Sequence, residues 1–92
     1  MNKVIFRREA DADLRAIVEW YEGVAPDAVN AILADIYRSI DQLIDFPRSG
    51  PKVSGQRFRR IVTQKYHFKI AYLVDPDAVV IIGIFRYQNR EH

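Results

Sequence analysis

The side chains that could do chemistry are mainly cations in the second half of the sequence. They are Arg57, Arg59, Arg60, Lys65, Lys69 and Arg86, interleaved with Phe58, Tyr66 and Tyr87. Arginine and lysine pair with phosphates, and aromatic rings stack on unpaired bases, so the set is suited to RNA. It is suited equally to an acidic protein segment. The cluster therefore predicts a contact surface and leaves both classes of partner open.

The distribution of charge along the chain favours an anionic partner. Residues 1–46 hold five basic and nine acidic groups, a net charge of −4, whereas residues 47–92 hold nine basic and three acidic groups, a net charge of +6. A concentrated positive field attracts and holds negative partners. We expect the second half to meet a polyanion or an acidic protein.

Several kinds of chemistry are disfavoured by what the sequence lacks. There is no cysteine, the two histidines are His67 and His92, and no glycine-rich phosphate loop or serine nucleophile elbow is present. The first 13 residues are too charged for a signal peptide, and the apolar run 78–85 is far shorter than the roughly 20 residues of a membrane span. We expect a cytoplasmic protein with no metal site, no cofactor and no membrane contact.

The first half of the chain predicts one strand followed by two helices. Residues 2–7 are short, apolar and β-prone, and from residue 9 the period changes to that of a helix, with Leu14, Ile17, Val18 and Tyr21 on one stripe. Gly23 is expected to end this helix, giving a span of 9–22. A second helix is expected from Pro26 to the residue before Pro47, because proline suits a first helical position and disfavours helix in the residue preceding it.

The second half predicts a loop and three strands. Residues 47–56 are rich in proline and glycine and have no period, and strands are expected over 57–64, 66–74 and 78–87, with a tight turn at 75–77. Alternation places His67, Lys69 and Ala71 on one face, which we expect to be open and basic. The sequence predicts a single domain over residues 1–92. Its fold class is α+β in the order β-α-α-β-β-β, with a two-helix hairpin on a small, twisted, mostly antiparallel sheet.

This order of elements, with several local strings, resembles the ParE/RelE superfamily of toxins from bacterial type II toxin-antitoxin systems, also known as the plasmid stabilisation family. The strings are residues 10–14 with Ile17 and Trp20-Tyr21, residues 43–50, residues 59–62 and residues 66–72. The resemblance covers nearly the whole chain. It implies a small cytoplasmic toxin that is neutralised by a cognate antitoxin, which we expect to bind through an acidic, partly disordered segment.

The resemblance leaves two targets open. RelE-like members cut messenger RNA on the ribosome, whereas ParE-like members look non-enzymatic and block DNA gyrase. If the protein is a metal-independent ribonuclease, the resemblance implies Lys65, Lys69, Arg86 and Tyr87 as catalytic residues. However, Gln88 and Asn89 stand where one ribonuclease subgroup has histidine and tyrosine, and an amide cannot transfer protons.

We therefore expect a gyrase inhibitor, with a ribonuclease and a degenerate toxin that only binds its antitoxin as alternatives. For contact with the target or the antitoxin, the expected residues are Arg57, Arg59, Arg60, Lys69, Arg86, Tyr87 and Arg90.

Overall fold

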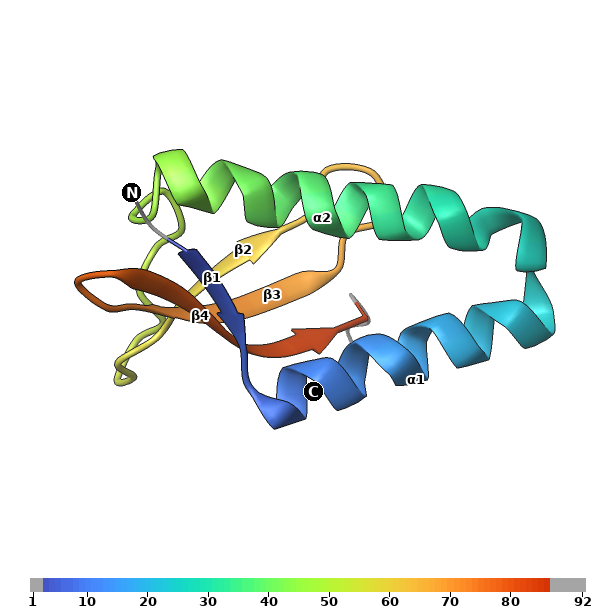
Figure 1. The fold of residues 1–92 in the computed structure, drawn as a ribbon, viewed down its shortest axis with the longest axis horizontal. Coiled ribbons are helices and arrows are strands. Elements are labelled where there is room, and N and C mark those ends of the chain that lie inside the picture. Colours follow the sequence, from blue (N-terminus) through green and yellow to red (C-terminus); the bar gives the residue numbers. More distant parts are fainter. Residues whose placement is uncertain (1–2, 87–92) are drawn as a thin grey trace.

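The structure of the protein, a computed structural model, describes residues 3–86. Along the chain the elements are β1 (Lys3–Phe6), α1 (Arg8–Val24), the 3-10 turn η1 (Pro26–Ala28), α2 (Val29–Asp45), β2 (Arg59–Val62), β3 (Lys69–Val74) and β4 (Ala78–Phe85). The two helices form an antiparallel hairpin joined at η1, beside a twisted sheet (Figure 1). The predicted α+β class and element order are confirmed.

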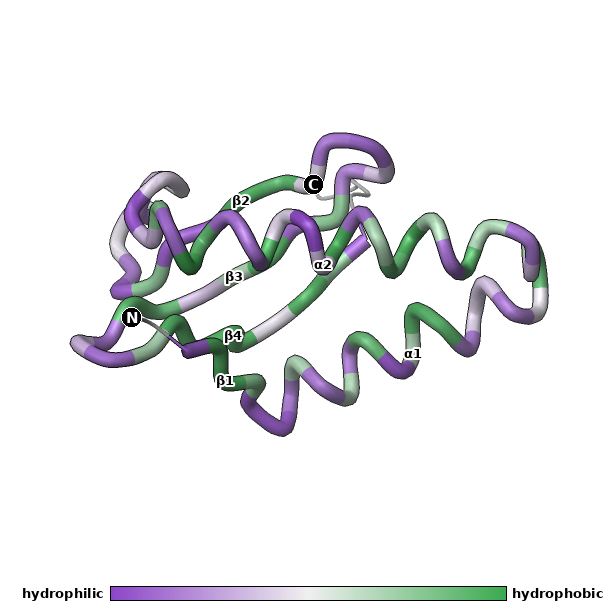
Figure 2. Tube along the Cα trace, turned by 45° about the horizontal axis from the view of Figure 1, so that its top comes forward, coloured by the Kyte–Doolittle hydropathy of each residue, from purple (hydrophilic) through white to green (hydrophobic). Residues whose placement is uncertain are grey.

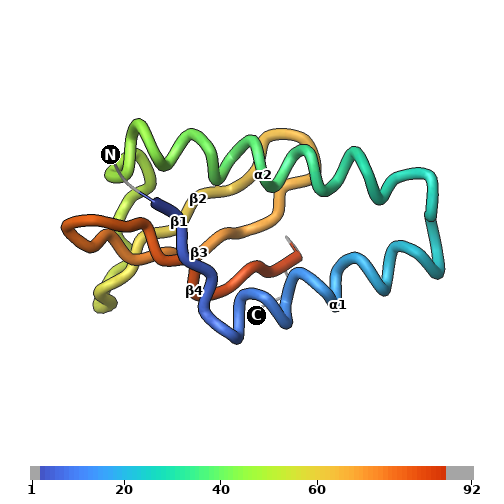
Figure 3. The backbone as a smooth tube through the Cα atoms, viewed as in Figure 1, coloured from blue at the N-terminus to red at the C-terminus, as the bar shows by residue number. Residues whose placement is uncertain are grey.

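The sheet is mixed, with the strand order β1-β4-β3-β2. Strand β1 runs parallel to β4, and the other two pairings are antiparallel. Although β1 and β4 come from opposite ends of the sequence, they lie side by side (Figure 3). Strand β4, the most apolar segment, is therefore an inner strand, as its composition predicts.

Both helices bury their apolar stripes against one face of this sheet, where hydrophobic positions concentrate along β4 and recur along both helices (Figure 2). The core consists of Ala10, Leu14 and Ile17 from α1, of Ile32, Ile36, Ile40 and Leu43 from α2, and of Phe68, Ile70, Tyr72, Val79, Ile81 and Ile84 from the sheet side. We refer below to the covered face and to the open face of the sheet.

A bulge in β4 lets the covered face keep its apolar side chains. The register passes from Gly83 opposite Ala71 to Ile81 opposite Tyr72, so Ile82 has no partner across the ladder. Simple alternation would send Ile81 and Ile84 to opposite faces, because they are three residues apart. Both are nevertheless buried in the core, since the extra residue reverses the alternation.

Several predicted boundaries are wrong, the last strand ending at Phe85 among them. Helix α1 continues through Gly23 and ends at Val24, because one exposed glycine costs only about 1 kcal/mol in a helix, whereas Pro26 disfavours helix at the residue before it. Strands β2 and β3 are shorter than the predicted 57–64 and 66–74, since residues 63–68 form the connection between them. His67 lies in that connection, with a φ of 60°, and not on a strand face.

The loop after α2 has no regular structure, but it is tied to the sheet. The Tyr72 hydroxyl accepts a hydrogen bond from the Gly50 N–H at 3.0 Å, and the Pro51 carbonyl accepts one from the Arg60 N–H at 3.1 Å. The backbone at Gly50 approaches so closely that a Cβ there would lie 2.7 Å from the Arg60 carbonyl oxygen and 2.8 Å from the Tyr72 hydroxyl. Only glycine fits this position without a shift.

Candidate interaction surface

The open face of the sheet is largely apolar. Strand register arranges it in four rows: Lys3 and Ala78; Ile5, Val80 and Leu73; Gly83, Ala71 and Arg60; Phe85, Lys69 and Val62. Ile5, Val62 and Phe85 are 44%, 43% and 50% exposed. The paired residues of this face include cations and no acid, as predicted, but most of its side chains are apolar, which was not predicted. Three cations, Lys3, Arg60 and Lys69, stand among apolar side chains, several of which are accessible.

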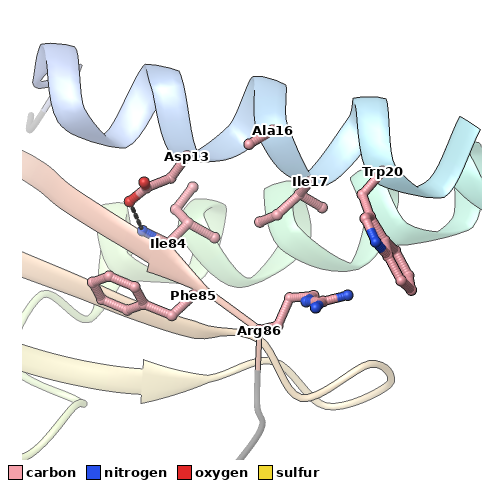
Figure 4. A pocket seen from close by; sticks show the side chains of 7 residues that line it. All are labelled: Asp13, Ala16, Ile17, Trp20, Ile84, Phe85 and Arg86. Atoms are coloured by element: carbon pink, nitrogen blue, oxygen red, sulfur yellow. Dashed lines mark hydrogen bonds between the residues drawn. The ribbon is translucent and has the colours of Figure 1, made fainter.

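The two cations nearest the end of β4 lie on opposite faces of the sheet. Lys69 is paired with Phe85 and shares the open face with it. The next residue, Arg86, turns to the covered face, where its guanidinium carbon lies 4.1 Å from the centre of the Trp20 ring on α1. Figure 4 shows the Phe85 and Arg86 side chains leaving the strand in different directions.

Arg86 belongs to a groove of about 330 Å³ between α1 and the end of β4 (Figure 4). Beyond the end of β1, the edge of β4 is capped by α1: the Asp13 carboxylate accepts a hydrogen bond from the Ile84 N–H at 3.0 Å. Trp20, which is 48% exposed, packs edge to face on Tyr21, and Tyr21 packs on Phe68. The stacked Arg86 thus extends an aromatic chain that begins in the core.

Replacing Arg86 by alanine should cost about 0.5 to 1 kcal/mol of stability, because a partly exposed cation over tryptophan contributes about this much. Trp20 is the one tryptophan, so its fluorescence reports on the site directly. We expect an altered emission spectrum in Arg86→Ala and a smaller change in Arg86→Lys, measured before and during a denaturant titration. A spectrum unchanged by Arg86→Ala would mean that the stacking does not persist in solution.

The three arginines around β2 have different environments. Arg57 is exposed and precedes the strand, and Arg60 is exposed on the open face. Arg59 is half-buried, and its guanidinium donates hydrogen bonds to the carbonyls of Gly50 at 2.7 Å and Arg48 at 3.4 Å. Arg59 therefore holds the loop after α2, and its role in binding stays a prediction.

The connection between β2 and β3, residues 63–68, is held by a carboxylate from the other layer of the fold. Asp35 on α2 is 1% exposed, and its two oxygens accept hydrogen bonds from the backbone N–H groups of Lys65 at 3.1 Å and Tyr66 at 2.8 Å. The connection is also closed on itself, because Thr63 and Phe68 exchange two hydrogen bonds of 2.9 Å. We call residues 63–68 the anchored turn.

The Asp35 carboxylate is kept charged by these donors. Burial raises the pKa of Asp35, but hydrogen bonds from the Thr63 hydroxyl and from the Tyr66 and Lys65 N–H groups, together with the nearby charge of Arg38, outweigh burial and lower the pKa below its ordinary value. The Arg38 guanidinium is 4.0 Å away and largely exposed, so the hydrogen bonds contribute more than this ion pair.

The structure separates the predicted site residues into groups. Lys65 is exposed on the anchored turn, Lys69 and Arg86 lie at the same end of the sheet on opposite faces, and Arg57, Arg59 and Arg60 lie around the start of β2. Tyr87 and Arg90 lie outside the described residues, as do Gln88, Asn89 and His92.

Sequence reasoning missed two residues. Asp35 interrupts the apolar character of α2 next to Ile36, and an acid at such a position could have signalled a buried carboxylate. Trp20 is the other, because its place in the family string does not by itself predict a site, although a large exposed aromatic residue beside an arginine is typical of contact surfaces.

Within residues 3–86 the structure brings together no group of three or more potential metal-ligating side chains. The search of the same residues for a helix both long enough and apolar enough to cross a bilayer finds none.

Comparison with known proteins shows to which protein family the chain belongs. Residues 4–90 match the model of the family described as the ParE toxin of the type II toxin-antitoxin system parDE. No curated protein matches the chain. The chain therefore belongs to the ParE toxin family of type II toxin-antitoxin systems.

Solved structures agree on the fold. One, described as the chromosomal ParDE toxin-antitoxin system from P. aeruginosa, superposes with a TM-score of 0.82 at 22% identity, covering 96% of this chain and 98% of that one. Another, the solution structure of the conserved hypothetical protein HP0894 from Helicobacter pylori, gives a TM-score of 0.60 at 16% identity, with coverages of 95% and 96%. At these identities the likeness concerns the fold alone.

Proposed function

We propose that this ParE-family toxin inhibits growth by binding DNA gyrase, without catalysing a reaction. The observation that carries the proposal is the placement of Lys69 and Arg86 on opposite faces of the sheet. Cleaving RNA needs a base, an acid and cations gathered around one phosphodiester. Side chains divided between two faces do not converge in this way, and this favours an inhibitor that acts by contact.

The proposal includes a cognate antitoxin that covers the open face. An apolar surface with Arg60 and Lys69 among its side chains fits a segment that carries apolar residues flanked by acids. Such a segment would fold on binding and would stabilise the toxin by mass action. In this proposal residues 1–92 act as one domain in the cytoplasm, where gyrase works.

Phe85→Ala should weaken antitoxin binding about thirtyfold, the equivalent of about 2 kcal/mol, because exposed aromatic residues at the centre of an interface often dominate affinity. Phe46→Ala is the matched control: Phe46 is 66% exposed, but it follows α2 and lies away from the open face. Titration calorimetry with the purified antitoxin measures both. Equal effects of the two substitutions would contradict this docking site.

The function itself is tested by expression in a bacterial host. Production of the toxin should stop growth, and co-production of the protein encoded beside it should restore growth and raise the melting temperature of the toxin. Codon-positioned cleavage of messenger RNA in a translation extract, lost on Lys69→Ala, would instead support the ribonuclease. Antitoxin binding without growth arrest would indicate a degenerate toxin.

A further inference from the structure

The anchored turn is a longer connection than two antiparallel neighbouring strands require. Strands β2 and β3 are antiparallel neighbours, and two residues are enough to join such strands. This chain uses six, and it fixes them with a buried carboxylate from α2, 28 positions before the turn begins. The conformation of the exposed residues of the turn is therefore set by α2 as well as by the two strands.

The backbone of the turn is also held in a sparsely populated conformation. His67 has a φ of 60°, in the left-handed region that only a few per cent of non-glycine residues adopt, histidine among the more frequent of them. Its surroundings are the two Thr63–Phe68 hydrogen bonds and the Asp35 carboxylate. Imposed conformations of this kind are concentrated at functional sites, where they present side chains in a fixed arrangement.

The side chains that the turn presents are those of a contact surface. Lys65 and His67 are exposed, and the Tyr66 ring is 38% exposed although its N–H is held by Asp35. Register places the turn beside the end of β4, because Lys69 is paired with Phe85. The turn therefore lies at the same end of the sheet as Trp20 and its stacked arginine.

The composition of this end of the sheet suits a protein partner. Tyr66 offers a partly exposed ring and Lys65 a charge, and Trp20 with its stacked Arg86 lies at the same end of the sheet. Tyrosine, tryptophan and arginine are enriched at protein–protein contacts, where acids of the partner can pair with Lys65.

We infer that the anchored turn is a preformed element through which the toxin contacts its protein target, with Lys65 and Tyr66 as contact residues and Asp35 as the positioning residue. This inference rests on the proposed function, which supplies gyrase as the target. Because the turn is fixed before binding, little conformational entropy is lost on contact. The open face remains available to the antitoxin.

The contact role is tested with the double variant Lys65→Ala, Tyr66→Ala. Its matched control is Lys52→Ala, Tyr37→Ala, which removes the same residue types from exposed positions elsewhere. We expect the first variant to need at least ten times more protein for half-inhibition of gyrase supercoiling, with unchanged antitoxin affinity, and the control to match the wild type. Wild-type inhibition by the first variant, or a parallel loss of antitoxin affinity, would overturn the inference.

The positioning role is tested with Asp35→Asn below its melting temperature. Amide hydrogen exchange at Lys65 and Tyr66 should accelerate at least tenfold while exchange at Ile81 stays slow, and gyrase inhibition should weaken in step. Fast exchange with full inhibition would refute the role of Asp35. If the wild type stops growth but leaves gyrase active, the proposed target is wrong. Growth inhibition by the same variants would then decide whether the turn contacts the actual target.

Discussion

Asp35→Ala should lower the free energy of unfolding by about 3 kcal/mol. The substitution removes the acceptor for the N–H groups of Lys65 and Tyr66 and for the Thr63 hydroxyl, and a buried donor left unpaired costs about 1 to 3 kcal/mol. For a chain of this size the melting temperature should fall by roughly 10 to 20 °C. Asp41→Ala, which removes an exposed acid from the same helix, should change stability by less than about 0.5 kcal/mol.

The same carboxylate should give the protein a distinct response to acid. The pKa of Asp35 is lower in the folded protein than its ordinary value of 3.8, so its contribution to stability is complete well above pH 3.8 and is lost as the pH falls from there through the folded pKa. Denaturant titrations at several pH values should show a shallower loss of stability below pH 3.8 in Asp35→Asn than in the wild type. Identical slopes would mean that another group controls acid unfolding.

Gly50→Ala should be the second strongly destabilising substitution, at about 3 kcal/mol. Its Cβ would lie 2.7 Å from both the Arg60 carbonyl oxygen and Cγ2 of Ile61, and 2.8 Å from the Tyr72 hydroxyl. Overpacking of a tight site typically costs about 1 to 3 kcal/mol, and a shift of the loop would also weaken the hydrogen bond from the Gly50 N–H to Tyr72.

A second glycine gives a control of opposite sign. At Gly23 an added Cβ would meet no atom within 4 Å, and the residue lies inside α1. Gly23→Ala should therefore raise stability by about 0.5 to 1 kcal/mol, because alanine is the better helix former. Thermal unfolding of both variants checks the pair. Equal effects would show that the contacts around Gly50 are looser than described.

The sequence was sufficient for the fold because its periods are strong. Four apolar positions at helical spacing defined α1, and the apolar run 78–85 identified the inner strand. The bulge at Ile82 was not predicted, although Gly83 lies next to it and an isolated glycine within a strand is a signal of a bulge. The end of α1 at Val24 could not be predicted from residue type alone. It depends on how the small cost of Gly23 in a helix compares with the restriction that Pro26 places on the residue before it.

The candidate site was less predictable, because alternation assigns residues to faces only where the strand is regular. Lys69 lies on the open face as expected, but Arg86 turns toward Trp20, a residue 66 positions earlier in the chain. The anchored turn depends on Asp35, which reaches it from another element. Such long-range pairs leave no periodic signal in the sequence.

The central claim, that this ParE-family toxin acts on gyrase by contact, is tested most directly by a supercoiling assay with purified gyrase and purified toxin, run beside a translation extract. The proposal predicts that supercoiling is inhibited in proportion to the toxin added, that antitoxin restores it, and that ribosome-bound messenger RNA stays intact. Cleaved messenger RNA together with unimpaired supercoiling would contradict the proposal.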